Sequence, residues 1–425
     1  MLKKLGAIAA VGGVTAAVVA ATLGGTASAT VSKTSPLCKK AGIGFAGPLS
    51  GGAAFLGDDQ SNWVKLYIKD WNAGKAIPGV PKKLHRVKLS LAFAGDSTLN
   101  ADKAKTVALH MVSIKSILGM VGFAGSNEVL GGGPVMDAGH LPFVSGSATL
   151  DTLATGAKGQ KPITYFYRVV PPNAVQAKIV PYIITKLKLK KGDKVMVVDD
   201  SEAYGIGLAT DAQKVFTSHG IQVTRKSVEE TDNNPGGAAG FASDISPVAQ
   251  AAGAGGYKLV YAPTQDALDS QTFTDDLKTD GYHGAFMATD GSVSPGQFTS
   301  AGAYLSFFGP AITAITKSFR TAYTKAYGAK SASDPFGAPS FVAAQMLGVA
   351  VSEECSAVHG NLPSNIAAAR TAVAKKLAKV KLPSTILGYP VSFNNPKDAH
   401  HGPATGATLF QIQSNGTYKE LYAVK

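Results

Sequence analysis

Short polar segments that carry hydroxyl, amide or acidic side chains follow apolar runs at several points of the sequence. Hydroxyl groups and free backbone N–H groups can hold a carboxylate, and an acidic side chain can hold an ammonium group. If these segments converge they suit a zwitterion, although a single Ser or Thr in such a place is also an ordinary helix N-cap. The residues are Ser50, Ser126, Ser147, Thr149, Tyr204, Gln265 and Asp290.

The sequence holds no motif for catalysis or for cofactor binding. Gly42, Gly44 and Gly47 match the G-x-G-x-x-G spacing of a dinucleotide-binding turn, but that turn needs a helix directly after the glycines. Here Ile43 and Phe45 alternate with the glycines, which indicates a strand. We therefore expect no catalytic residue, no cofactor and no metal site. A Ser-His-Asp set assembled from distant segments would leave no such signal.

The first 29 residues have the pattern of a secretory signal peptide. Lys3 and Lys4 form a basic head, an apolar run follows, and Ala27-Ser28-Ala29 is a small-residue cleavage site. A membrane anchor is the alternative, but glycines interrupt the run and the cleavage site favours removal. We therefore expect residues 1–29 to be removed and the protein to be secreted, periplasmic or attached to the cell envelope.

Basic residues are spread along the whole chain. The formal net charge is +13, from 41 Lys and Arg against 28 Asp and Glu. Lysine-rich segments such as KLKLKKGDK lack the aromatic residues of a nucleic-acid groove. We expect a solvated basic surface, a monomer and no nucleic-acid partner. Attachment to anionic envelope polymers is the weaker alternative.

The two cysteines, Cys38 and Cys355, are too few for a disulfide-stapled miniature domain or a zinc cluster. Cys38 precedes the first expected strand, and Cys355 ends an apolar helix pattern. Export would permit a disulfide between them. The alternative is two separate buried thiols, and we favour the disulfide.

Strand and helix patterns alternate along the chain, which predicts an α/β fold. The alternation restarts after about residue 170, which predicts two doubly wound parallel-sheet lobes. The expected strands are 42–48, 87–93, 116–123, 141–146, 194–200, 221–228, 258–263, 284–291 and 388–393, with a hairpin over 407–422. The expected helices are 57–72, 100–112, 133–139, 207–220, 241–252, 266–281, 315–328, 339–355 and 365–380.

An ordered series of segments resembles the type I periplasmic solute-binding proteins, in particular the branch that binds leucine, isoleucine and valine. The segment GPLSGGAAFLGDDQSNWVKLYIKDWNAG is similar to the opening of that family. No single motif is decisive, but the likeness extends in order over nearly the whole mature chain. The further segments are PFVSGSAT, DDSEAYGIGLA, KLVYAP, FMATDG, GYPVSFNNP and LFQIQSNGTY.

The resemblance implies how the chain is divided and how it works. Residues 39–170 and 311–388 would form the N-terminal lobe, and residues 171–310 and 389–425 the C-terminal lobe. The hinge would consist of three crossovers near 168–173, 309–314 and 388–393. The protein would capture a small molecule by hinge closure and deliver it to an ABC permease in the membrane.

The resemblance also implies the ligand site. Ser126 and the segment Ser147, Ala148, Thr149 would hold the carboxylate and amine of an amino acid. Tyr204 would be the aromatic residue of the second lobe. Asp290 would pair with the ligand ammonium, where the family more often has Glu.

Two positions depart from the family's aromatic pattern. Leu56, with Phe55 beside it, stands where the first loop normally has an aromatic wall, and Gln265 replaces an aromatic residue after the KLVYAP strand. The expected ligand is therefore an amino acid or a related small polar molecule. The alternatives are a ligand-binding sensor that reports to a receptor, an envelope scaffold that binds no small molecule, and a secreted hydrolase, for which no nucleophile–base pair is visible.

Overall fold

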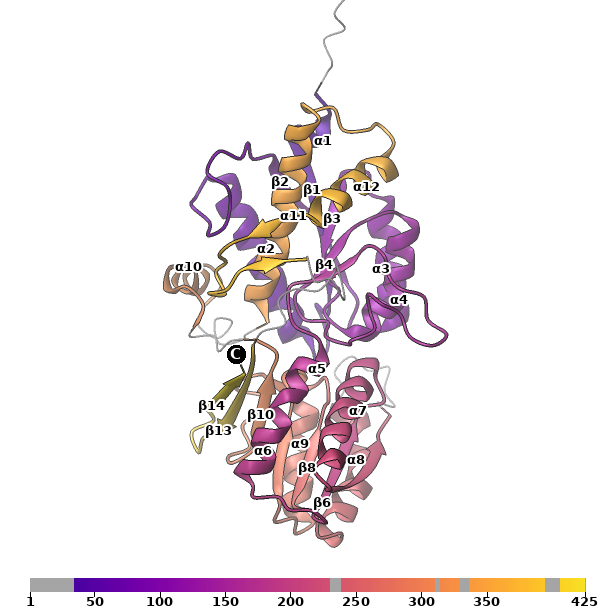
Figure 1. Ribbon diagram of the computed structural model, residues 1–425, viewed down its shortest axis with the longest axis vertical. Coiled ribbons are helices and arrows are strands. Elements are labelled where there is room, and N and C mark those ends of the chain that lie inside the picture. The colour runs from indigo at the N-terminus through magenta and orange to yellow at the C-terminus, as the bar shows by residue number, and fades with distance from the viewer. Residues whose placement is uncertain (1–33, 230–237, 310–313, 329–335, 394–405, 425) are drawn as a thin grey trace, which may run out of the picture. The chain divides into compact units, whose positions relative to one another are not determined.

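The computed structural model describes residues 34–229, 238–309, 314–328, 336–393 and 406–424, with residues 238–244 described by their backbone alone. The predicted signal peptide, residues 1–29, lies outside the described residues. The described chain contains two large sheets, each of which is covered by helices (Figure 1). We refer to each sheet with its helices as the first and the second lobe.

The first lobe is built on a five-stranded parallel sheet with the order β2-β1-β3-β4-β5. β1 is buried along nearly its whole length, as expected for a strand covered on both faces. Figure 1 shows the sheet between two pairs of helices, α2 with α11 and α3 with α4. The strands are β1 (Lys40–Gly47), β2 (Lys88–Asp96), β3 (Ile117–Val121), β4 (Phe143–Ser145) and β5 (Phe166–Arg168). The helices are α1 (Pro36–Lys39), α2 (Ala54–Asn72), α3 (Ala101–Ser113), α4 (Ser126–Ala138), α10 (Lys317–Tyr327), α11 (Gly337–Ala357) and α12 (Ile366–Leu377).

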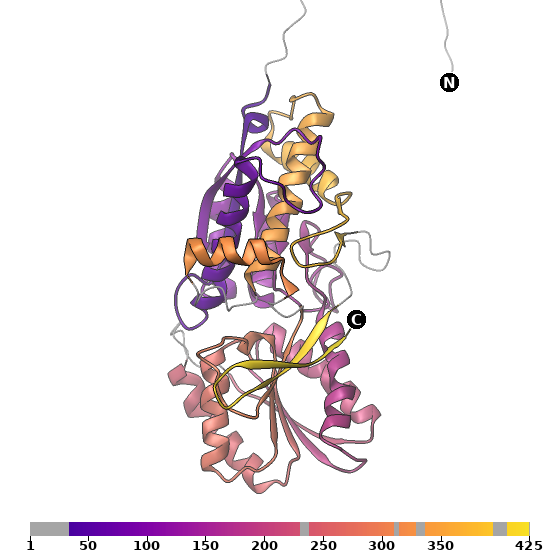
Figure 2. The ribbon, with the colours of Figure 1, turned by 90° about the vertical axis from the view of Figure 1, so that its left-hand side faces the viewer.

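The second lobe is built on a seven-stranded sheet with the order β14-β13-β10-β9-β8-β6-β7. Strands β6 to β10 are parallel, and the last two strands form an antiparallel hairpin at one edge (Figure 2). The strands are β6 (Lys194–Asp199), β7 (Gln222–Ser227), β8 (Leu259–Ala262), β9 (Ala285–Ala288), β10 (Tyr304–Phe307), β13 (Ala407–Ile412) and β14 (Tyr418–Val424). The helices are α5 (Asn173–Gln176), α6 (Val180–Lys186), α7 (Ala203–Ser218), α8 (Ala238–Ala254) and α9 (Ala267–Thr279).

The expected α/β fold with two doubly wound lobes is confirmed. Several elements were not expected, among them β5, β10 and the short helices α5 and α6, because their apolar runs are too short to show a period. Helices α4 and α7 begin earlier than expected, at Ser126 and Ala203. The residue boundaries of the lobes stay a prediction. A small hairpin, β11 (Lys381–Leu382) with β12 (Val391–Ser392), spans the predicted boundary at residue 388.

Helix α11 forms the centre of the first lobe. Its residues from Gly337 to Ser352 are all buried, and an apolar helix without a polar face belongs inside a core. It packs along α2, where Trp63 and Tyr67 meet Phe341 edge-on. Near its C-terminal end, Cys355 forms a disulfide with Cys38, with the two Cα atoms 5.5 Å apart.

Arg370 of α12 ties three helices together from inside the core. Its guanidinium is buried and donates hydrogen bonds of 3.0–3.3 Å to the carbonyl oxygens of Val112, Ile114, Ile117 and Gly139. Three of these carbonyls lie at the C-terminal ends of α3 and α4, where the helix dipole favours a cation. Burial lowers the pKa of Arg370 to about 10, so the side chain stays charged at neutral pH.

We expect Arg370→Met to lower the free energy of unfolding by about 2–4 kcal/mol, because buried carbonyl groups lose their donor. Lys375→Met, at an exposed position of the same helix, is the control and should change stability by about 0.5 kcal/mol or less. Urea denaturation followed by circular dichroism measures both. Equal effects of the two substitutions would contradict this role of Arg370.

Candidate ligand-binding site

A small pocket lies where loops of the two lobes meet. Its cavity volume is about 30 Å³. Apart from Phe336, each lining residue belongs to the segment that follows a parallel strand: β1, β2, β3 and β4 of the first lobe, and β6, β8 and β9 of the second. The lining consists of Leu56, Leu99, Ala124, Gly125, Ser126, Ser147, Tyr204, Gln265, Asp290, Gly291 and Phe336.

The second lobe contributes a buried acid to this pocket. Asp290 is only 4% exposed, and the hydroxyl of Tyr204 donates a short hydrogen bond to its carboxylate. The same hydroxyl lies 2.7 Å from Oγ1 of Thr289. Burial raises the pKa of Asp290 to about 6, against the lowering effect of the hydrogen bonds from Tyr204 and Gln176. The site therefore holds a carboxylate that is ionised at neutral pH and that a cation would stabilise.

The first lobe contributes hydroxyl groups and a helix N-terminus. Ser126 is the first residue of α4, and its Oγ accepts a 3.2 Å hydrogen bond from the backbone of Leu150. The N-terminus of a helix favours an anion through its free N–H groups and its dipole. The N–H group of Gly125 is already bound by the carboxylate of Glu128, at 2.6 Å. Burial raises the pKa of Glu128 to about 7.

Ser147 lines the pocket, but its hydroxyl also serves the framework. It donates to the carbonyl oxygen of Ala124 at 2.8 Å and accepts from Nε2 of Gln60 at 2.8 Å. Gln60 in turn accepts from Ser340 at the start of α11. Because its donor is already used, the hydroxyl of Ser147 can offer a ligand only a lone pair.

The structure brings six of the predicted residues to the pocket and keeps three away from it. The backbone N–H group of Ala148 donates to Oγ of Ser145, and the carbonyl oxygen of Thr149 accepts from the backbone of Asn173. Phe55 is not a lining residue, and it packs edge-on against Phe336, with ring centroids 6.3 Å apart. The six that line it are Leu56, Ser126, Ser147, Tyr204, Gln265 and Asp290.

The sequence reasoning missed four lining residues, and it had Gly125 only as the alternative to Ser126 one position earlier. Leu99, Ala124 and Gly291 follow strand ends, so the rule that located Ser126 and Asp290 could have located them. Phe336 immediately precedes α11 and follows no strand, so it had no such signal. Its ring also contacts Phe307 and Phe308 of the second lobe, at centroid distances of 5.6 and 5.9 Å.

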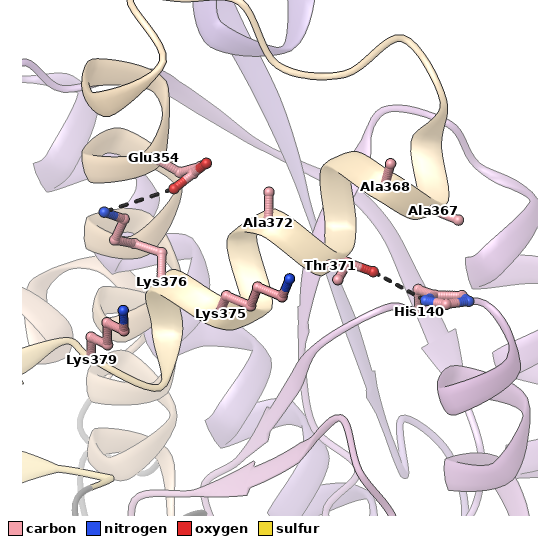
Figure 3. A pocket seen from close by; sticks show the side chains of 9 residues that line it. All are labelled: His140, Glu354, Ala367, Ala368, Thr371, Ala372, Lys375, Lys376 and Lys379. Carbon is pink, nitrogen blue, oxygen red and sulfur yellow. Dashed lines mark hydrogen bonds and ion pairs between the residues drawn. The ribbon is translucent and has the colours of Figure 1, made fainter.

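A larger hollow of about 550 Å³ lies on the surface of the first lobe, over α12 and α11 (Figure 3). Its lysines, Lys375, Lys376 and Lys379, stand at and just beyond the last turn of α12, where positive charge stabilises the helix end. Lys376 also pairs with Glu354 at 3.8 Å. Helix stability therefore accounts for these lysines, and the carbonyl groups of the helix end disfavour an anion here.

The described parts of the chain offer neither a metal site nor a membrane-spanning helix. No cluster of three or more His, Cys, Asp or Glu side chains among the described residues could hold a metal ion. None of the described helices is long and apolar enough to cross a membrane. The pocket between strand ends is thus the site for which the structure offers convergent polar groups.

A family model described as "Periplasmic binding protein" matches residues 40–417. The chain belongs to the periplasmic binding protein family. Within this family it has the fold of the type I proteins, as three solved structures illustrate. A search of curated proteins gave no match.

The first of these periplasmic binding proteins is a leucine-binding protein from Thermotoga maritima, with 17% identity and a TM-score of 0.71 over 91% of this chain and 99% of that one. The second is a branched-chain amino acid transporter substrate-binding protein from Streptococcus pneumoniae in complex with isoleucine, with 19% identity and a TM-score of 0.70 over 90% and 99%. The third is a solute-binding protein of an ABC transporter from R. palustris in complex with 4-hydroxybenzoate, with 16% identity and a TM-score of 0.69 over 91% and 97%. These identities show a common fold, while the ligands of the three proteins differ.

The raised pKa of Asp290 leads to a prediction about stability without ligand. In the folded protein the pKa is about 6, above the ordinary value of 3.8, so ionisation of Asp290 removes stability as the pH rises from about 4 to above 6. We expect Asp290→Asn to raise the free energy of unfolding by about 1–3 kcal/mol at pH 8 and by little at pH 4. The control is Asp275→Asn, on the exposed surface of α9. Urea denaturation at both pH values measures the effect, and a loss of stability at pH 8 in Asp290→Asn would contradict it.

Proposed function

We propose that this chain is an extracytoplasmic solute-binding protein that captures an amino acid or a related small polar molecule and delivers it to an ABC permease. Membership of the periplasmic binding protein family supports solute binding as part of an ABC transporter. The observation that carries the ligand class is the buried pair of Asp290 and Tyr204, which lines one pocket with Ser126 at the N-terminus of α4.

This arrangement suits a zwitterion. The carboxylate of Asp290 would accept the ligand ammonium group, and Ser126 with the start of α4 would receive the ligand carboxylate. Both charges of the ligand would be paired when they leave water, as burial of charge requires. Leu56, Leu99 and Phe336 provide the apolar part of the pocket. No catalytic group is needed for this function, and no observation favours the hydrolase alternative.

Hinge closure is the proposed mode of capture. A cavity of about 30 Å³ admits little more than one or two water molecules, so a ligand of amino-acid size requires the walls to separate before it enters. A ligand that contacts both lobes only when they are together shifts the population towards that arrangement. The predicted removal of residues 1–29 would leave the protein outside the cytoplasmic membrane, where such a ligand is captured.

The first experiment identifies the ligand. The protein is purified in its native state and then unfolded, and the small molecules that it releases are identified by mass spectrometry. Each amino acid is then tested by thermal shift, since a ligand raises the apparent stability once its concentration exceeds Kd. A released amino acid that also raises Tm would support the proposal. If none of the amino acids raises Tm, the ligand is not an amino acid.

The second experiment tests the role of Asp290. We expect Asp290→Ala to weaken binding of that amino acid more than tenfold, because removing one partner of a buried charged hydrogen bond costs about 2–5 kcal/mol. Asp275→Ala on the exposed surface of α9 is the matched control and should leave Kd unchanged. Isothermal titration calorimetry measures both. An unchanged Kd in Asp290→Ala would show that Asp290 does not bind the ligand.

A further inference from the structure

The backbone of Gln265 is anchored beside the pocket by a hydrogen bond. This residue follows β8, and its backbone N–H group donates to Oδ2 of Asp200 at 2.9 Å. The other oxygen of Asp200 accepts a 3.1 Å hydrogen bond from the backbone N–H group of Glu202, the residue directly before α7. One buried carboxylate therefore fixes both the Gln265 loop and the start of the helix that carries Tyr204.

The loop of Gln265 also packs tightly against the loop of Asp290. A Cβ atom added at Gly291 would lie 2.2 Å from the carbonyl oxygen of Thr264 and 2.6 Å from Cα of Gln265. Only glycine permits this approach. As a result, Gln265 lines the same pocket as Asp290, the residue that we assign to the ligand ammonium group.

The amide of Gln265 is the polar group of the pocket that the protein leaves unused. Among the described residues, neither its oxygen nor its nitrogen has a hydrogen bond, whereas Tyr204, Asp290, Ser126 and Ser147 all have one. Gln265 is half-buried, so a ligand that covers its amide removes the amide from water, which costs free energy unless the ligand forms a hydrogen bond with it. A ligand group that both donates and accepts, such as an amide or a hydroxyl, would restore these bonds.

We propose that Gln265 determines ligand specificity and that the site prefers an amino acid with an uncharged hydrogen-bonding side chain over an aliphatic one. This inference rests on the proposed function, and it goes further by naming the side chain of the ligand. An aliphatic side chain of equal shape would leave the amide of Gln265 unpaired, and a site built to form a hydrogen bond discriminates strongly against an analogue that cannot form it.

Two pairs of amino acids of nearly equal shape test the preference. L-asparagine is compared with L-leucine, and L-threonine with L-valine, by calorimetry on the mature protein. We expect the wild type to bind the polar member of at least one pair at least tenfold more tightly. Gln265→Leu should lose this preference, and Gln222→Leu, at an exposed position of β7, should keep it.

The outcomes separate the two proposals. If the aliphatic member of each pair binds the wild type as tightly as the polar member, or if Gln265→Leu keeps the wild-type preference, the assignment of Gln265 is wrong while the proposed function stands. If no amino acid binds at all, the ligand is not an amino acid and this inference is wrong, while capture of another small molecule is not excluded. The Tm of Gln265→Leu without ligand shows whether the variant is folded.

A second and independent observation concerns a contact between the lobes. Helix α7 of the second lobe packs closely against the loop after β4 of the first lobe. A Cβ atom added at Gly207 would lie only 2.5 Å from Cδ1 of Leu150. Asp211 lies four residues after Gly207 and therefore on the same face of the helix. There its carboxyl group meets that of Asp151.

The two carboxyl groups are placed so that they can share a proton. Oδ2 of Asp211 is buried and has no donor among the described residues, while Oδ1 pairs with Lys214 at 3.0 Å. Oδ1 of Asp151 accepts from the backbone of Ala174 at 3.2 Å. The buried Arg168 lies near Asp151, and Tyr261 of β8 lies near Asp211. Burial and the neighbouring Asp211 raise the pKa of Asp151 to about 7.

We infer that Asp151 and Asp211 form a proton-linked contact that favours the closed lobes when one proton is shared and opposes closure when both groups are ionised. When the proton is present, the hydroxyl of one carboxyl group donates to Oδ2 of the other, which supplies the missing donor. When it is absent, two like charges face each other. The closed arrangement is therefore favoured as the pH falls.

Small-angle X-ray scattering of the ligand-free protein at pH 5 and pH 8 tests the contact. We expect a smaller radius of gyration at pH 5 for the wild type. Asp211→Asn should lose this pH response, because its amide donates to Asp151 at either pH. The control is Asp275→Asn. Asp275 pairs with Lys278 three residues later, just as Asp211 pairs with Lys214. This variant should keep the pH response.

A radius of gyration that is equal at both pH values in the wild type would overturn this inference. Retention of the wild-type pH response in Asp211→Asn would also overturn it. If Asp211→Asn fails to fold, as judged by circular dichroism, Asp151→Asn supplies the same donor from the other lobe, and the same criteria apply to it. Ligand-induced compaction without a pH response would leave the proposed function intact and would overturn only the proton-linked contact between Asp151 and Asp211.

Discussion

A parallel sheet brings the carboxyl ends of its strands to one edge, and this constraint decides where the molecule can bind a ligand. Both lobes are built on parallel strands, and the segments that follow these strands supply every lining residue of the pocket except Phe336. The helices that cover the sheets begin at the same edge. The constraint therefore places the N-terminus of α4 and the first turn of α7 at the pocket as well.

The chemistry of the two edges differs. The second lobe presents a buried carboxylate with its hydrogen-bonding partner Tyr204, and the first lobe presents a helix N-terminus with hydroxyl groups. Most of these groups also hold the protein together, as the two bonds of Ser147 show. The selectivity of the site therefore depends on groups with remaining hydrogen-bonding capacity, of which the amide of Gln265 has the most.

The order of strands and helices was largely visible in the sequence, because buried parallel strands are apolar runs and their helices are amphipathic. The strand-end rule also located Ser126, Tyr204, Gln265 and Asp290. It could not show that Ala148 turns its N–H group to Ser145, since a local hydrogen bond between side chain and backbone leaves no periodic pattern. Phe336 was invisible for another reason, because its position depends on tertiary packing of α11 against α2.

Protonation of Asp151 and protonation of Asp290 have opposite effects on ligand capture by the closed lobes. As the pH falls through about 7, protonation of Asp151 supplies the missing donor between the lobes and favours closure. As it falls further through about 6, protonation of Asp290 removes the partner of a ligand ammonium group and disfavours binding. Closure with an ionised Asp290 is therefore best supported between these two values. At lower pH the same lobes would close on a site that has lost its charge, so acid would release an amino acid by weakening its contacts rather than by opening the cleft.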